Sequence, residues 1–239
     1  MRTTLVNGLA GLTLVAGITI VSVACSNASN QTASAGAAAE AATAGDASLA
    51  PGGKATDSLA KIADASRIQG SPSAKLWVIE VSDFQCPYCK EWHDATYQMI
   101  VNDYVKTGRV RMAYVNFPLS IHAHAHDAAI AAMCAGAQDK FWPMHDSLFA
   151  TQARWEREAD PSATFASLAA SIGVNASGYK ACLSSPGISA LVAGDQERAR
   201  AGGVNATPSF WIGGGKLLEG AVPTADMKAA IDQALASSK

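Results

Sequence analysis

The segment KLWVIEVSDFQCPYC, residues 75–89, decides the fold of this chain. Residues 75–82 are rich in β-branched and aromatic side chains, which predicts a buried strand. Helical patterning begins at Pro87 and continues to about Lys106. Proline is well tolerated at the first helical position, because the N–H that it lacks would have no partner there. The segment therefore predicts a strand and a helix joined by a short turn, with Cys86 immediately before the helix.

The two cysteines of this segment are placed for thiol chemistry. Cys86 falls at the N-cap, where unpaired backbone N–H groups and the helix dipole favour an anion. We therefore expect a thiolate of lowered pKa, which is both a nucleophile and a good leaving group. Cys89 lies one turn further along the same helix face, within reach of a disulfide with Cys86 and shielded from solvent. A zinc half-site is the competing interpretation, but the chain has no second Cys-x-x-Cys to complete it.

Outward from this segment, the patterning predicts one more central strand and then a long helical region. Residues 109–117 alternate polar and apolar side chains, which is typical of a strand. Helical patterning alone fills residues 121–203, interrupted by proline and glycine. Residues 209–212 and 216–219 flank a glycine turn and predict a hairpin, and residues 225–236 predict a closing helix.

At this point the sequence resembles the thioredoxin superfamily, and within it the DsbA-like thiol oxidoreductases, from about Ile68 to the C-terminus. The motifs that carry the resemblance are DFQCPYC, the strand end Asn116–Leu119 with the His- and Ala-rich helix after it, FWPMHDSLF at 141–149 and ATPSF at 206–210. The resemblance implies an α/β thioredoxin fold with an all-helical insertion at about 121–203. It also implies catalysis of disulfide formation in extracytoplasmic proteins by dithiol–disulfide exchange through Cys86 and Cys89. We expect no cofactor and no metal.

Further site residues follow from the same resemblance. Thr207–Pro208 would be a cis-proline loop beside the cysteines that pairs with substrate as an added strand, and Pro87 and Tyr88 would also contact substrate. The competing interpretation of Thr207–Pro208 is an ordinary turn. Glu80 would be a buried acid that passes protons to and from Cys89, with a pKa raised by desolvation. The competing interpretation of Glu80 is a solvent-facing residue on a strand edge.

Tyr88 departs from the strong oxidases of this family, which carry histidine at that position. A Pro-Tyr interior occurs in glutaredoxins, whose reduction potentials are about −200 to −230 mV against about −120 mV for DsbA. An isomerase or reductase kept reduced by a membrane electron donor therefore stays open, as does a non-catalytic thioredoxin-like binding module. His93, one turn beyond Cys89, is expected to be a solvated or packed side chain rather than a catalytic one.

The remaining cysteines and histidines carry weaker signals. Cys134 and Cys182 lie in separate helical stretches. If Cys25 carries lipid, four cysteines remain, and this even number suggests one catalytic pair and a structural bridge between Cys134 and Cys182. Two separate buried thiols are the alternative. His122, His124 and His126 form an HxHxH run, but a metal site would need a third placed ligand, so a polar helix start is favoured. The apolar residues of 141–149 are expected to pack in the core, with a substrate-facing groove as the alternative.

The N-terminus predicts export. Residues 1–24 hold one charge and an apolar run of about 15 residues, short of the ~20 that span a bilayer. The small residues before Cys25 resemble a lipobox, which implies a lipid-anchored mature N-terminus at Cys25; a plain cleaved signal and an uncleaved anchor are the alternatives. Residues 25–60 are low in complexity and predict a disordered tether, with a helical stalk as the alternative, ahead of a thioredoxin-like domain at 61–239.

Composition limits the partners. Charged residues are 16% of the 239-residue chain and the formal charge is −2, against a typical charged share of ~25%. This offers no basic face for a phosphate backbone, so no nucleic acid is expected. The expected location is the periplasm or cell envelope, where disulfides persist. The expected partners are extracytoplasmic protein thiols and disulfides, the membrane through a lipid anchor, and a quinone-linked membrane redox protein that the resemblance implies.

Overall fold

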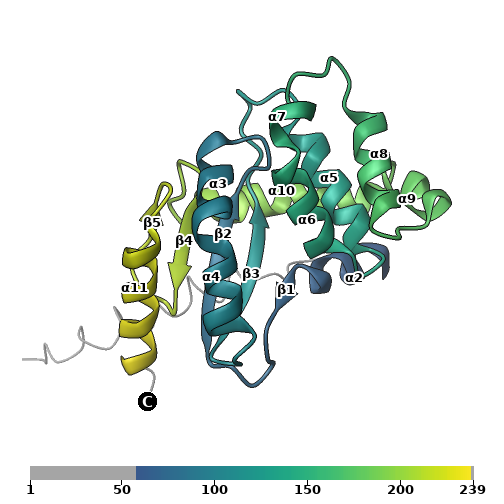
Figure 1. Ribbon diagram of the computed structural model, residues 1–239. Coiled ribbons are helices and arrows are strands. Elements are labelled where there is room, and N and C mark those ends of the chain that lie inside the picture. Colours follow the sequence, from purple (N-terminus) through teal and green to yellow (C-terminus); the bar gives the residue numbers. More distant parts are fainter. Residues whose placement is uncertain (1–57, 238–239) are drawn as a thin grey trace, which may run out of the picture. The chain divides into compact units, whose positions relative to one another are not determined.

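The computed structural model describes residues 58–237 (Figure 1). The predicted leader 1–24, the lipid attachment at Cys25 and residues 25–57 of the predicted tether lie outside the described residues. The tether prediction is wrong from Ser58 on, because helix α2 (Ser58–Ser66) begins there. Its Ala60 and Ala63 are fully buried, since small side chains let α2 pack closely against helix α5. No helix within the described range has both the length and the apolar character to cross a bilayer.

A five-stranded sheet forms the centre of the fold, in the order β1-β3-β2-β4-β5. The central strands β2 and β3 are parallel, and the other three pairings are antiparallel. The two strands predicted at 75–82 and 109–117 and the hairpin are confirmed to within two residues at each end. The strands are β1 (Ile68–Gln69), β2 (Leu76–Ser82), β3 (Val110–Asn116), β4 (Ser209–Ile212) and β5 (Leu218–Glu219).

Helices cover both faces of this sheet because its central strand is apolar on both sides. Val78 packs on one face with Trp92 and Tyr97, whereas Ile79 and Val81 pack on the other. The first face lies under the helical run that follows Cys86 and under α11, which runs beside β4 and β5 (Figure 1). The predicted helix from Pro87 is confirmed, with two π-helical segments in it. This run comprises α3 (Pro87–Trp92), η1 (His93–Tyr97), α4 (Gln98–Ile100) and η2 (Val101–Val105), and the closing helix is α11 (Thr224–Ser237).

The stretch between β3 and β4 is helical throughout, as the resemblance implied. Its last helix, α10, packs on β3 and on α2 and α5. The apolar residues of the 141–149 helix are core residues: Phe141, Met144, Leu148 and Phe149 are buried. The fold class expected from the sequence, an α/β sheet with an all-helical insertion, is confirmed. The inserted helices are α5 (Ala125–Gly136), α6 (Phe141–Ala150), α7 (Gln152–Trp155), α8 (Ser162–Ser171), α9 (Ala176–Cys182) and α10 (Pro186–Ala201).

A disulfide joins Cys134 of α5 to Cys182 of α9. The two cysteines are 48 positions apart in the sequence, so the bridge closes a long loop of the unfolded chain. By the loop-entropy relation, such a bridge stabilises the fold by roughly 4 kcal/mol. It fastens two helices of the insertion to each other.

A fully buried arginine connects the start of the chain to the insertion. The Arg67 guanidinium donates hydrogen bonds to the carboxylates of Asp64 and Asp195. Asp195 also accepts from both the backbone N–H and the side-chain amide of Asn116, at 3.1 and 2.9 Å. Burial by itself lowers the pKa of Arg67, but the two carboxylates outweigh it and the net pKa is raised. This network joins α2, the end of β3 and α10.

Candidate active site

The cysteine pair sits where the sequence predicts, at the end of β2. Cys86 is the N-cap of α3, with Pro87 at the first helical position. Its backbone N–H donates to the carbonyl of Asp83 at 3.1 Å, which closes the turn between strand and helix. Both Cys86 and Cys89 are free thiols in the structure. This is the dithiol state of the pair, so the disulfide expected between them is not formed here and stays part of the proposal below.

The environment of Cys86 favours a thiolate. A hydrogen bond from the Cys89 thiol lowers the pKa of Cys86 to about 6, and the N–H groups of Tyr88 and Cys89 at the helix start act in the same direction. Burial opposes this effect but does not cancel it. Cys86 is 3% exposed and Cys89 is 0% exposed, so of the two only Cys86 offers surface to an incoming substrate.

Cys89 behaves in the opposite way. Burial raises its pKa well above the ordinary value, and the Cys86 thiolate next to it acts in the same direction. The backbone N–H of Asp83 donates to the Cys89 sulfur at 3.5 Å. The pair is therefore asymmetric, with an outer sulfur held as an anion near neutral pH and an inner sulfur held as a thiol.

This asymmetry predicts the pH dependence of alkylation. In the reduced protein, modification of Cys86 by iodoacetamide should rise with pH around a midpoint near 6, as expected from its lowered pKa of about 6. An ordinary thiol titrates at about 8.5. Mass spectrometry of rapidly quenched samples assigns the label to each cysteine, with a Cys89→Ala variant as control because it removes the thiol that donates to Cys86. In that variant the midpoint should move upward; identical midpoints would contradict the assigned cause.

Three side chains outside the Cys-x-x-Cys hold the active-site loop. The Asp83 carboxylate accepts hydrogen bonds from the backbone N–H groups of Gln85 and Leu119, at 2.8 and 2.9 Å, and contacts His122 Nδ1 at 2.7 Å. Gln152 Nε2 donates to the carbonyl oxygens of Phe84 and Cys86, at 2.7 and 3.1 Å. Sequence reasoning missed these roles, because all of these contacts except that between Asp83 and Gln85 join residues far apart in the chain.

The Thr207–Pro208 peptide bond is cis, and the loop lies against the outer cysteine. The Cys86 thiol donates to the Thr207 carbonyl oxygen at 3.4 Å. Tyr88 is 61% exposed, so its ring stands at the surface next to Cys86. The structure thus brings together Cys86, Cys89, Tyr88 and the Thr207–Pro208 loop.

Glu80 is buried rather than solvent-facing, which rules out the strand-edge interpretation. It lies in β2 opposite Tyr114 of β3, and alternation along the strand puts it on the face of Val78, under α3. Burial raises the pKa of Glu80 to about 7, with the nearby Ser82 hydroxyl and His93 acting in the opposite direction. Neither carboxylate oxygen has a hydrogen-bond partner among the described residues.

The HxHxH run does not act as a unit. His122 contacts Asp83, the His124 ring contacts the carbonyl of Glu158, and His126 lies beside Asp127. A different group gathers next to the site: His93, His145 and Asp146 offer polar atoms that all lie within 4.8 Å of one another. Both rings already contact the same carboxylate oxygen, Oδ1 of Asp146, so hydrogen bonding accounts for this cluster.

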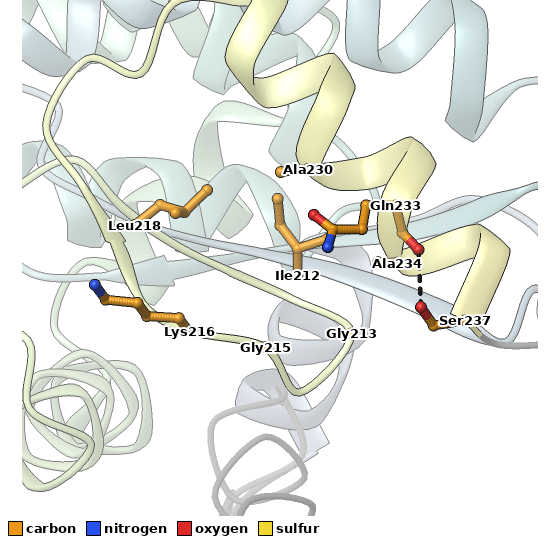
Figure 2. A pocket seen from close by; sticks show the side chains of 9 residues that line it. All are labelled: Ile212, Gly213, Gly215, Lys216, Leu218, Ala230, Gln233, Ala234 and Ser237. Atoms are coloured by element: carbon orange, nitrogen blue, oxygen red, sulfur yellow. Dashed lines mark hydrogen bonds between the residues drawn. The ribbon is translucent and has the colours of Figure 1, made fainter.

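A hollow lies at the opposite end of β4 from the cis bond. Figure 2 shows it between the Gly213–Gly215 turn and α11, with Ile212, Leu218 and Ala230 around it. Its volume is about 480 Å³. None of the residues lining it belongs to the cysteine pair or to the Thr207–Pro208 loop, so this hollow is separate from the candidate active site.

Comparison with known proteins finds a thioredoxin family model and relatives named as protein-disulfide oxidoreductases. A family model described as thioredoxin matches residues 63–233. A putative protein-disulfide oxidoreductase of Rickettsia conorii is 26% identical over 190 residues, covering 79% of this chain and 67% of that protein. A Na(+)/H(+) antiporter, NhaA 3 of Salinispora tropica, is 30% identical over 177 residues, covering 74% of this chain and 26% of the antiporter. This chain thus corresponds to about a quarter of that relative's length.

The solved structures agree on the fold. The crystal structure of Wolbachia pipientis alpha-DsbA1 superposes with a TM-score of 0.64 at 20% sequence identity, covering 72% of this chain and 92% of that one. At this identity the likeness speaks for the fold, including the helical insertion.

Proposed function

This chain belongs to the thioredoxin family, and on that basis we propose that it is a DsbA-like thiol–disulfide oxidoreductase that forms disulfide bonds in extracytoplasmic proteins through Cys86 and Cys89. The observation that carries the proposal is the asymmetry of the pair, with the pKa of Cys86 lowered to about 6 and that of Cys89 raised. A stabilised thiolate favours the reduced form of the pair, and a pair that is easily reduced is an oxidant towards its substrates.

The reaction starts from the Cys86–Cys89 disulfide. A substrate thiolate attacks the Cys86 sulfur, a bond forms between the two, and the Cys86–Cys89 bond breaks with its electron pair on Cys89. A second substrate thiolate then attacks the substrate sulfur of this mixed disulfide, and Cys86 leaves as a thiolate. The substrate loses two electrons and gains a disulfide, and the pair is left reduced.

Glu80 exchanges a proton with Cys89, the inner cysteine. Cys89 leaves as a thiolate, and its raised pKa means that it takes up a proton. Glu80 has a pKa of about 7, so near neutral pH it can supply that proton or accept it in the reverse direction.

The contacts with the substrate backbone and side chains are assigned to the residues that border Cys86, which are Pro87, Tyr88 and Thr207–Pro208.

The proposal includes the setting of the enzyme. The lipobox-like sequence before Cys25 supports export with a lipid anchor at Cys25, and the Cys134–Cys182 disulfide supports an oxidising compartment. There the reduced pair needs an electron acceptor, and a quinone-linked membrane protein is the proposed one. A second candidate function, an isomerase or reductase kept reduced by a membrane electron donor, stays open because the Pro-Tyr interior of the motif occurs in glutaredoxins.

A redox titration separates the two functions. Equilibrating the protein with mixtures of reduced and oxidised glutathione should give a potential for Cys86–Cys89 between those of DsbA, about −120 mV, and of glutaredoxins, about −200 mV. The redox state trapped by acid in intact cells should be mostly disulfide. A potential in the range of glutaredoxins and thioredoxin, about −200 to −270 mV, with a mostly dithiol pair in cells would overturn the oxidase assignment in favour of the isomerase or reductase. A Cys134→Ala/Cys182→Ala variant is the control that removes the other disulfide from the thiol count.

A further inference from the structure

Polar groups without partners collect under α3, on the face of the sheet that carries Glu80. Within the described part of the chain, no hydrogen-bond partner is found for the carboxylate oxygens of Glu80, the Tyr114 hydroxyl or His145 Nε2, all of them buried. Buried polar groups are normally satisfied, and a group of exceptions calls for an explanation. Here the exceptions come from three elements, Glu80 from β2, Tyr114 from β3 and His145 from α6.

His93, Asp146 and His145 connect this region to the surface. His145 Nδ1 contacts Asp146 Oδ1 at 2.8 Å, and His93 Nε2 contacts the same oxygen at 3.4 Å. The exposed side-chain fractions rise along the series, from 0% for His145 to 11% for His93 and 46% for Asp146. The outer members therefore meet solvent while the innermost does not.

Ring contacts join His93 and His145 to Tyr114, which lies beside Glu80 in the sheet. The His93 and His145 rings are 5.2 Å apart between centroids, and the His145 and Tyr114 rings are 5.4 Å apart. Tyr114 is the direct strand neighbour of Glu80. Glu80 and His93 also act on each other electrostatically, the carboxylate raising the pKa of His93 and the imidazolium lowering that of Glu80.

We propose that His93, positioned by Asp146 and His145, is the group through which Glu80 exchanges its proton with solvent during the thiol chemistry of Cys89. His145 does not take up or release a proton in this process: its ring stays neutral and donates a hydrogen bond from Nδ1 to Asp146. Asp146 holds the His93 ring, and His93 gives a proton to the Glu80 carboxylate after Glu80 has protonated Cys89, or takes one in the reverse direction. His93 is then regenerated from solvent. The inference rests on the proposed function.

The electrostatics fit these roles. Burial lowers the pKa of His145 to about 4, so this ring is neutral at neutral pH. Burial alone also lowers the pKa of His93, but hydrogen bonds to Asp146 and Asp94 outweigh it and the net pKa is raised. The pKa of Glu80 is raised to about 7 and that of His93 is raised above its ordinary value, so near neutral pH His93 can give a proton to Glu80 or take one from it. The titratable and charged groups that face them are Asp146 and His145 from α6, Tyr114 from β3, Tyr97 and Asp94 from η1, and Lys90 and Cys89 from α3.

The test follows the closure of the Cys86–Cys89 disulfide. The reduced protein is mixed with excess oxidised glutathione and quenched in acid, and mass spectrometry gives the decay of the Cys86–glutathione mixed disulfide. In this step Cys89 loses its proton to Glu80 and attacks the Cys86 sulfur, and glutathione leaves as a thiolate. The rate should rise with pH around the pKa of Glu80. In His93→Gln the imidazolium that lowers this pKa is gone, so the midpoint should move to higher pH.

Imidazole rescue tests the transfer itself. In His93→Ala, closure should slow several-fold in weak buffer and recover when imidazole is added, whereas the parent protein and His126→Gln should not respond. His126 is the matched control because it is an exposed histidine beside Asp127. A His93→Gln profile that superposes on the parent, or a His93→Ala rate that imidazole leaves unchanged in the correctly folded protein, overturns the inference. If the parent closes no disulfide, or Glu80→Gln keeps the parent's pH profile, the proposed function or its proton step has failed instead.

Discussion

A Cys86→Ser variant should lose the oxidation of a dithiol peptide almost entirely, by about a thousandfold or more, as expected when a covalent nucleophile is removed. A serine hydroxyl at the start of α3 cannot form a disulfide with Cys89 or with substrate, so neither step of the exchange remains. The measurement is the rate of disulfide formation in a peptide with two thiols, with oxidised glutathione as the final acceptor.

Two matched variants make this result specific to the outer sulfur. Cys89→Ser keeps the nucleophile but removes the sulfur that resolves it, so it should accumulate a mixed disulfide at Cys86 that is visible by mass. The Cys134→Ala/Cys182→Ala variant loses the bridge within the insertion and should retain exchange at temperatures where it stays folded. Full dithiol oxidation by Cys86→Ser would refute the assignment of the active site.

The largest loss of stability should come from Arg67→Met. The substitution removes the cation from a network that is fully buried at Arg67 and Asp195, and leaves the carboxylates of Asp64 and Asp195 without it. Breaking a buried ion pair by removing one partner typically costs about 3–5 kcal/mol, because the remaining charge is buried and unpaired. Urea denaturation followed by circular dichroism, with the Cys134–Cys182 disulfide intact, gives the change in the free energy of unfolding.

The same substitution at the surface provides the control. Arg154 is 74% exposed and pairs with Glu158 one turn along the chain, and such pairs contribute at most about 1 kcal/mol. Arg154→Met should therefore change stability little. Adding Asp195→Asn to Arg67→Met should recover part of the loss, since it removes a buried negative charge. Equal effects at positions 67 and 154 would contradict the structural role given to the buried network.

The parts of the site that could be predicted are those set by local backbone. The strand, the turn and the helix start at Pro87 follow from residues that are neighbours in the sequence, and they place Cys86 at the N-cap. The same local patterning predicted the helical stretch before β4. It failed at Ser58, where polar and small residues suggested a tether, because the burial of α2 depends on packing against α5.

The parts that could not be predicted depend on contacts between distant residues. His122 lies 39 positions from the Asp83 that it contacts, and Gln152 lies 66 positions from Cys86. His93 and Asp146 are 53 positions apart, so the sequence could suggest a packed histidine but not the carboxylate that it contacts. No periodicity in the sequence indicates which of these distant residues contact each other.

By itself, then, the sequence determined which sulfur is held at a helix start, which strand precedes it and where the helices are inserted, because these features follow from local backbone preferences and apolar periodicity. Tertiary structure decided between the two interpretations of Glu80 in favour of burial, and it alone decided which side chains hold the active-site loop and which carboxylates pair with Arg67. The physical reason is that the pKa of a carboxyl group and the pairing of a buried charge depend on which distant groups surround them, and only the folded chain brings those groups together.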